Sequence, residues 1–177
     1  LMKNTENLLR RIIKEAASET LVDEIQKFVD GNQFLRGSVV DAEDLIETDD
    51  YVVYASDEGL KHTKDRHTDA NAPGSLINSG VDLRSLIMSL ASTSPTSSGG
   101  MVKWEGVKSP SGPIGKMGLA VADPKEVADM KDYTMPGGRG ETVKVAPGER
   151  KPTDQVTLVT AKLGDLTDGR AALSLVT

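Results

Sequence analysis

The sequence of 177 residues contains no cysteine, few aromatic residues and no long apolar run. Without cysteine, disulfide bonds and thiolate zinc sites are excluded. Because aromatic residues make up only 3% of the sequence, the core has to be built mainly from aliphatic side chains. No apolar run approaches the roughly 20 residues of a membrane-spanning helix, and no signal peptide is visible. We therefore expect a cytoplasmic or virion-associated protein that has no membrane partner.

The sequence also has fewer basic than acidic residues. Its 21 Lys and Arg and 27 Asp and Glu give a formal net charge of −6. A domain that binds nucleic acid over its whole surface is usually basic, so the charge disfavours that class but is compatible with a local basic groove. The acidic stretch at 39–50 is compatible with a short helix. It lacks the alternating acids, glycine and final glutamate of a calcium loop. The sequence predicts no metal site and no cofactor.

Residues 4–31 show the apolar spacing of an amphipathic helix. The apolar set consists of Leu8, Leu9, Ile12, Ile13, Ala16, Leu21, Val22, Ile25, Phe28 and Val29. Ser18 is compatible with a break and a second helix, which Gly31 would end. We expect the first group, at 9–16, to be buried against the rest of the chain, or in a homo-oligomer or against another protein.

The apolar pattern changes after the Ser/Gly-rich linker at 91–100. A further helix is predicted before it, at 80–90, and alternating strand patterns follow it between 101 and 177, separated by turn residues. This order predicts an α+β fold in which N-terminal helices pack on a C-terminal antiparallel β-sheet. The expected division is a helical segment at 1–50 and an α+β domain at 51–177. Leu1 before Met2, and the apolar residues that end the sequence, lead us to expect a truncated chain.

The stretch "GLKHTKDRHTD" (59–69) holds both histidines of the sequence, His62 and His67. Two metal ligands on one helix are better placed four residues apart than five, and no HExxH pattern is present. One interpretation is that both are surface residues near a helix end and have no function. The other is acid–base catalysis, for which histidine is suited near neutral pH, with Lys64 or Arg66 stabilising a phosphorane-like charge.

The stretch "HTKDRHTDANAPGSLINSGVDLRSLI" resembles the histidine-bearing segment of phage and toxin nucleases in the barnase–EndoU–colicin–RelE superfamily. In that superfamily two histidines with a Lys or Arg between them lead into a helix and a strand meander. The later stretches "ERKPTDQVTLVTAKLG" and "ALSLVT" are similar to its strands, which present a Thr or Ser to the active site. The resemblance covers roughly residues 55–177, but it does not account for the N-terminal helices or the acidic net charge.

The resemblance implies metal-independent cleavage of RNA, in which the 2′-hydroxyl attacks the neighbouring phosphate. His67 would act as base or acid with His62 as the second group, and Thr160 or Thr177 would orient the phosphate. Phosphate would be bound by Lys64 or Arg66, and the stretch "GERKPTD" places two more cations where they could line a groove. The substrate-binding candidates are therefore Lys64, Arg66, Arg150 and Lys151.

Two other functions are compatible with the same residues. The N-terminal amphipathic pattern, the acidic charge, the threonine-rich strands and the glycine-rich loops also suit a non-enzymatic structural or interaction protein such as a phage virion component. A small-molecule-binding α+β domain is the third interpretation. The discriminating observation is whether the two histidines enter one cleft together with a cation and a strand threonine.

Overall fold

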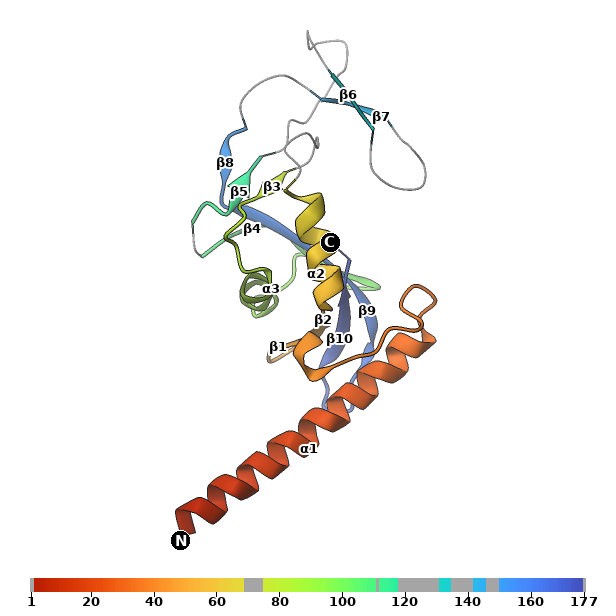
Figure 1. Ribbon diagram of the computed structural model, residues 1–177, viewed down its shortest axis with the longest axis vertical. Helices are drawn as coiled ribbons and strands as arrows, with labels where there is room; N and C mark the ends of the chain where they lie inside the picture. The colour runs from red at the N-terminus through yellow and green to blue at the C-terminus, as the bar shows by residue number, and fades with distance from the viewer. Residues whose placement is uncertain are drawn as a thin grey trace. The chain divides into compact units, whose positions relative to one another are not determined.

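The computed structural model describes residues 2–68, 75–110, 112–117, 131–134, 142–145 and 150–176. Its α-helices are α1 (Met2–Gly31), α2 (Asp57–Arg66) and α3 (Leu83–Ala91) (Figure 1). A short 3-10 helix, Ala42–Asp44, stands where the acidic stretch was expected to be helical, and it passes directly into a strand.

The strands of the described part form three sheets. The largest has the order β1-β2-β10-β9-β4 and consists of β1 (Leu45–Glu47), β2 (Tyr51–Tyr54), β10 (Ala171–Leu175), β9 (Gln155–Asp165) and β4 (Met101–Lys108). The second has the order β3-β5-β8 and consists of β3 (Leu76–Ile77), β5 (Gly115–Lys116) and β8 (Pro152–Thr153). The third is the pair β6 (Lys131–Thr134) and β7 (Thr142–Val145).

The chain divides into two compact units. Unit 1 consists of Leu1–Asp57, Ile87–Trp104 and Leu158–Thr177, and it contains α1 and most of the five-stranded sheet. Unit 2 consists of Glu58–Leu86 and Glu105–Thr157, and it contains nearly all of α2 together with the two smaller sheets.

The predicted α+β class is confirmed, with a long N-terminal helix packed on a mostly antiparallel sheet. Two details differ from the expectation. Strands β1 and β2 come from the N-terminal half, and β10 pairs with β2 in parallel, with Ala172 opposite Val52. Both strands are buried along most of their length, which is the pattern of central strands. Such a pattern does not reveal the direction of a strand, so the sequence could not predict the parallel pair.

Helix α1 is continuous from Met2 to Gly31, so the expected break near Ser18 is absent. Its C-terminal half packs on the sheet of unit 1, because Leu21, Ile25 and Val29 follow one another at intervals of four residues on one face and are buried. They share a core with apolar residues of the strands and loops: Val40, Val52, Tyr54, Leu166 and Ala172.

The N-terminal half of α1 is not covered by the described part of unit 1 and extends beyond its sheet (Figure 1). Leu8, Leu9, Ile12 and Ile13 are exposed by 58%, 57%, 52% and 59%. The structure therefore does not show the intramolecular burial that was one of the two expectations for this group. The alternative, burial against another chain, stays a prediction.

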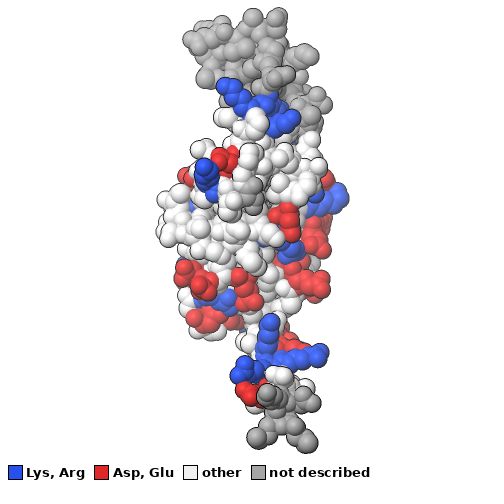
Figure 2. All heavy atoms as spheres, turned by 90° about the vertical axis from the view of Figure 1, so that its left-hand side faces the viewer, with Lys and Arg blue, Asp and Glu red and all other residues white. Residues whose placement is uncertain are grey.

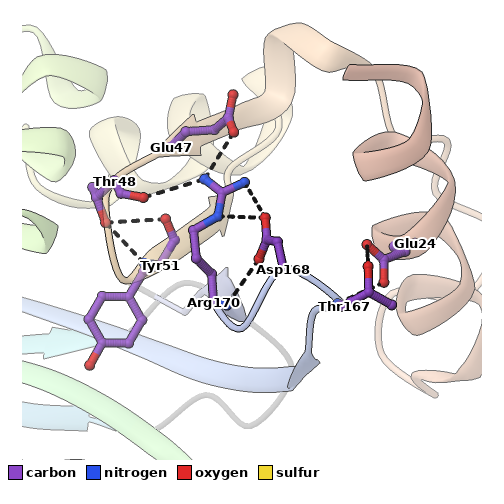
Figure 3. A network of polar contacts seen from close by, with 7 residues as sticks. All are labelled: Glu24, Glu47, Thr48, Tyr51, Thr167, Asp168 and Arg170. Carbon is purple, nitrogen blue, oxygen red and sulfur yellow. Dashed lines mark hydrogen bonds and ion pairs between the residues drawn. The ribbon is translucent and has the colours of Figure 1, made fainter. Parts of the chain in front are cut away.

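The helix comes close to the sheet at Gly164 of β9. A Cβ atom built on Gly164 would overlap the ring of Phe28, which lies against the core from α1. The missing side chain therefore lets the helix and the strand come together. Nearby, the Glu24 carboxylate of α1 accepts hydrogen bonds from the Thr167 amide (3.0 Å) and hydroxyl (3.1 Å), which fasten α1 to the turn that follows β9 (Figure 3).

The turn between β9 and β10 also carries a polar network centred on Arg170 (Figure 3). The Arg170 guanidinium donates to the Asp168 carboxylate from Nε (2.9 Å) and lies 2.7 Å from it at Nη2. Its Nη1 reaches the Glu47 carboxylate of β1 at 3.0 Å and the Thr48 carbonyl at 3.4 Å. The turn itself is made possible by Gly169, whose φ of +93° suits glycine. Arg170 therefore links the β9–β10 turn to the edge strand of the sheet.

Trp104 of β4, the one tryptophan of the sequence, is fully buried. Its indole Nε1 donates to the Thr93 carbonyl at 3.0 Å. Its ring packs edge-on against Tyr51, with the ring centroids 5.5 Å apart. The side chain therefore belongs to the core of unit 1.

We predict that Gly164→Ala destabilises unit 1, because the added methyl group overlaps the Phe28 ring. Overpacking of this kind costs about 1–3 kcal/mol. The free energy of unfolding from urea titration measures the effect. Gly99→Ala is the matched control, because a Cβ there meets no atom within 4 Å. Equal stability of the two variants would contradict the close approach of α1 and β9.

We predict that Arg170→Gln lowers the free energy of unfolding by about 1–2 kcal/mol. This is the contribution of charge-assisted hydrogen bonds, reduced because the carboxylates are exposed to solvent. Hydrogen bonds from Arg170 hold the pKa of Asp168 below its ordinary value. A carboxyl whose folded pKa is depressed contributes stability above its unfolded pKa, about 3.9, and loses it as pH falls through the folded value. The difference in melting temperature between parent and variant should be full at pH 7 and should shrink below about pH 4. A difference that persists unchanged in acid would contradict this account.

Candidate functional site

Helix α2 places the histidine segment in unit 2. The helix ends at Arg66, but the His67 amide still donates to the carbonyls of Thr63 (3.2 Å) and Lys64 (3.1 Å), so the helical turn continues through His67. On the solvent side, Lys61 pairs with Asp65 at 2.7 Å. The positions of the predicted site residues around α2 therefore follow helical geometry.

Helical geometry separates the predicted residues into two pairs. Lys64 and His67 are three residues apart and lie about 60° from each other around the axis, whereas His62 and Arg66 are four apart and lie about 40° from each other. The two histidines are about 140° apart, so they do not project from the same face of α2. His62 and Arg66 are exposed, and Lys64 and His67 are half-buried.

Three groups of His67 make hydrogen bonds: its amide, its carbonyl and its ring. Besides its amide contacts, its carbonyl accepts from the Ile77 amide of β3 at 2.8 Å, and its ring Nδ1 lies 3.0 Å from the Ser75 carbonyl. A carbonyl can only accept a hydrogen bond, so Nδ1 must carry the proton. In the neutral ring the lone pair is then on Nε2, which is the arrangement that a general base needs.

The three-stranded sheet brings two further predicted cations to the same end of unit 2. Leu76 of β3 pairs with Lys116 of β5, which pairs with Pro152 of β8. One position further, the Met117 amide donates to the Lys151 carbonyl at 2.8 Å. Ser75, which holds the His67 ring, therefore lies at the same register position as Lys151, two strands and about 10 Å away.

Arg150 precedes Lys151 in the chain and contacts the residue that follows β5. Its guanidinium Nη1 lies 3.4 Å from the Met117 carbonyl. Arg150 is half-buried, whereas the Lys151 side chain is exposed. The structure thus places Lys151 and Arg150 at the same end of the small sheet as Ser75, whose carbonyl contacts the His67 ring, and Lys64 lies on the helix face that His67 shares.

A shallow groove of about 300 Å³ runs between α2 and the start of α3. Its charged lining residues are Lys61, Lys64, Arg84 and Asp82. Asp82 caps α3, because its carboxylate accepts hydrogen bonds from the amides of Arg84 (3.1 Å) and Ser85 (3.3 Å). These bonds, chiefly from Ser85, lower the pKa of Asp82. Three cations and one carboxylate leave the groove with an excess of positive charge.

Sequence reasoning did not single out Arg84. It lies on the predicted helix at 80–90, but no motif marks it, and only the folding of α3 beside α2 brings it to the groove. The helix period alone could have separated His62 from His67, because residues five apart cannot share a face.

Of the two predicted threonines, one lies in unit 1 and the other outside the described residues. Thr160 belongs to unit 1 and is fully buried, and its hydroxyl donates to the Val102 carbonyl at 2.8 Å. Thr177 lies outside the described residues. That Thr160 or Thr177 orients a phosphate stays a prediction, and the contacts of Thr160 account for it as a core residue of unit 1.

The net charge is distributed unevenly over the two units. Unit 2 contains equal numbers of basic and acidic residues, so the whole formal charge of −6 belongs to unit 1. The acidic balance that disfavoured nucleic-acid binding therefore does not apply to the unit that carries the histidines.

Two general features of the described residues bear on the class of site. Within the described ranges, no three His, Asp or Glu side chains are grouped so that they could hold a metal ion. None of the helices in the same part of the chain is both long and apolar enough to cross a membrane.

Comparison with known proteins gives no relative: no family model, no curated protein and no solved structure matches this chain. Function therefore has to be inferred from the chemistry of unit 2 and the surface of unit 1.

Proposed function

We propose that unit 2 cleaves RNA by acid–base catalysis without a metal ion, with His67 as the essential catalytic residue. The observation that carries the proposal is the fixed His67 ring: its Nδ1 is bonded to the Ser75 carbonyl, so its Nε2 is the nitrogen able to take a proton. The resemblance of the histidine segment to phage and toxin nucleases supports the same chemistry.

In the proposed reaction, His67 Nε2 removes the proton of a ribose 2′-hydroxyl. The 2′-oxygen attacks the adjacent phosphorus, the bond to the 5′-oxygen breaks, and the products are a 2′,3′-cyclic phosphate and a 5′-hydroxyl end. A second group protonates the leaving 5′-oxygen. The resemblance assigns this role to His62, but its place about 140° around α2 from His67 does not favour a direct pair.

In the proposed reaction, the cations near His67 stabilise the negative charge of the transition state. Negative charge builds up on the phosphate oxygens in the transition state, and cations fixed beside them stabilise it. Lys64 lies next to His67 on α2 and lines the groove, while Lys151 and Arg150 lie at the sheet end that holds the His67 ring. Lys64 is therefore better placed for this task than Arg66.

We predict that His67→Ala lowers the rate of RNA cleavage by about 10²–10⁴-fold, the usual contribution of a general acid or base. His62→Ala is the matched control, a histidine of the same helix on another face, and it should lose less. The assay uses an end-labelled RNA oligonucleotide in excess chelator and identifies the cyclic phosphate. A DNA oligonucleotide of the same sequence lacks the nucleophile and should stay intact. Intact RNA with the parent protein, or equal cleavage by His67→Ala, would end the nuclease proposal.

We predict that Lys64→Ala reduces kcat/KM by about tenfold or more through lost stabilisation of phosphate charge, and that Arg66→Ala changes it less. The two substitutions each remove one positive charge from α2, so they separate local contact from general electrostatic attraction. Both are measured at several salt concentrations, because long-range attraction is screened by salt and contact is screened less. Equal losses at every salt concentration would show that Lys64 has no special position.

The non-enzymatic alternative is favoured by one specific observation, the exposed apolar side chains at 8–13 of α1. Such a surface on a projecting helix is typical of a protein that assembles with others. If the parent protein leaves RNA intact, a structural or interaction protein such as a virion component is the better description.

A further inference from the structure

The groove between α2 and the start of α3 begins one helical turn away from His67. Lys64 lines this groove and lies three residues before His67, about 4.5 Å away along the helix axis. Lys61 lines the groove too and lies about 4.5 Å further along the same axis. These steps are similar to the roughly 3.4 Å per nucleotide of a stacked DNA strand. A strand that follows α2 with one phosphate beside His67 thus has its next phosphate at the groove.

The lining of the groove combines apolar and charged side chains. Its apolar residues are Leu60, Val81 and Leu83, which are half-buried. The volume of about 300 Å³ lies at the lower end of the roughly 300–1,000 Å³ of small-molecule sites, which is room for about one nucleotide. Sites for single-stranded nucleic acid combine cations that follow the backbone with surfaces on which sugars and bases pack. The groove has both components.

Arg84 stands in the first turn of α3, where a positive charge is unfavourable because the N-terminus of a helix is itself positive. The amides of Arg84 and Ser85 are already bonded by the Asp82 carboxylate. That carboxylate also accepts from the Ser85 hydroxyl at 3.0 Å, so these donors offset its negative charge. An anion in the groove therefore meets the side chain of Arg84 rather than the end of the helix.

The other cations of the groove differ in their surroundings. Lys61 pairs with Asp65, but the two side chains are 76% and 60% exposed, and an exposed pair of this kind contributes little. Lys64 and Arg84 are half-buried. On the face drawn in Figure 2, Lys and Arg side chains lie in small groups, and several have Asp and Glu side chains near them. Binding of an anion is thus a local property of such a group and depends chiefly on Lys64 and Arg84.

We propose that the α2–α3 groove binds the phosphate next to the scissile phosphate of a single-stranded RNA, with Arg84 as its main contact. The inference rests on the proposed function, because His67 marks the position of the scissile phosphate. Arg84 binds the strand without taking part in the reaction, since its phosphate does not react. The preferred substrate is therefore a strand with more than one phosphate.

Cleavage of two substrates tests the position of Arg84. A dinucleoside monophosphate carries only the scissile phosphate, whereas an RNA oligonucleotide also carries the neighbouring ones. We expect Arg84→Gln to lower kcat/KM for the oligonucleotide by about tenfold, the loss of one charge-assisted contact. The loss should come mainly from KM, and cleavage of the dinucleoside monophosphate should not change. Lys64→Ala should impair both substrates. Equal losses on both substrates with Arg84→Gln would overturn the proposal.

A binding measurement separates this inference from the nuclease proposal. The probe is a fluorescent 2′-O-methyl RNA oligonucleotide, which lacks the nucleophile and stays intact, and its anisotropy is measured at several salt concentrations. Each phosphate contact contributes about 0.7 to the slope of log K against log salt for a single strand. Arg84→Gln should lower the slope by about that amount, and Arg84→Lys, which keeps the charge, should retain it. Arg36→Gln removes an exposed arginine of unit 1 and is the matched control.

The outcomes are distinct. An unchanged slope with Arg84→Gln, or an equal fall with Arg36→Gln, would contradict the groove as a phosphate site. A slope that depends on Arg84 in a protein that leaves RNA intact would retain the phosphate site and end the nuclease proposal alone. Melting temperatures should stay close to that of the parent, because loss of a cation does not weaken the first turn of a helix. A marked fall with Arg84→Gln would assign Arg84 to the fold and overturn the inference.

Discussion

Unit 1 depends on the insertion of β10 between β2 and β9. This strand pairs in parallel with β2 and antiparallel with β9, and it contributes Ala172 to the core on which α1 rests. Its neighbouring turn carries Arg170, which reaches the edge strand β1, and Thr167, which bonds α1. One strand thus connects the helix, the edge and the centre of the sheet, and the loss of its pairing would separate all three.

The segment that carries His67 is held by fewer strand contacts than the core of unit 1. The three strands of the small sheet are two residues long each, so few hydrogen bonds set the position of the site residues. The pairing of β5 with β3 is nevertheless close at Gly115, where a Cβ atom would overlap the Leu76 carbonyl. A glycine at that point allows the close pairing that aligns Ser75 with Lys151. Local geometry, rather than a large core, therefore places His67 relative to the cations.

Much of the fold could be predicted from the sequence, because helix and strand periods are local. The helical character of α1 and α3 and the turn at Gly169 follow from spacing and turn chemistry, but the continuity of α1 past Ser18 does not. Partner choice is not local: nothing in "YVVY" or "ALSLVT" indicates that these two strands pair, or in which direction. The same limit applies to the site. Types and spacing suggested His67 and its cations, but Arg84 joins the groove only through the packing of α2 and α3, and the catalytic roles stay predictions.

The pairing of β2 with β10 has a consequence for the order of events during synthesis. Tyr51 and Ala171 are paired on neighbouring strands although about 120 residues separate them in the chain. Contacts of such long range form late and slow the folding of a domain. A ribosome that adds 5–20 residues per second exposes β2 for many seconds before β10 exists, with an unsatisfied edge that a chaperone or a neighbouring nascent chain could bind. The α1 helix, by contrast, depends on contacts that are local in sequence, and it is made first.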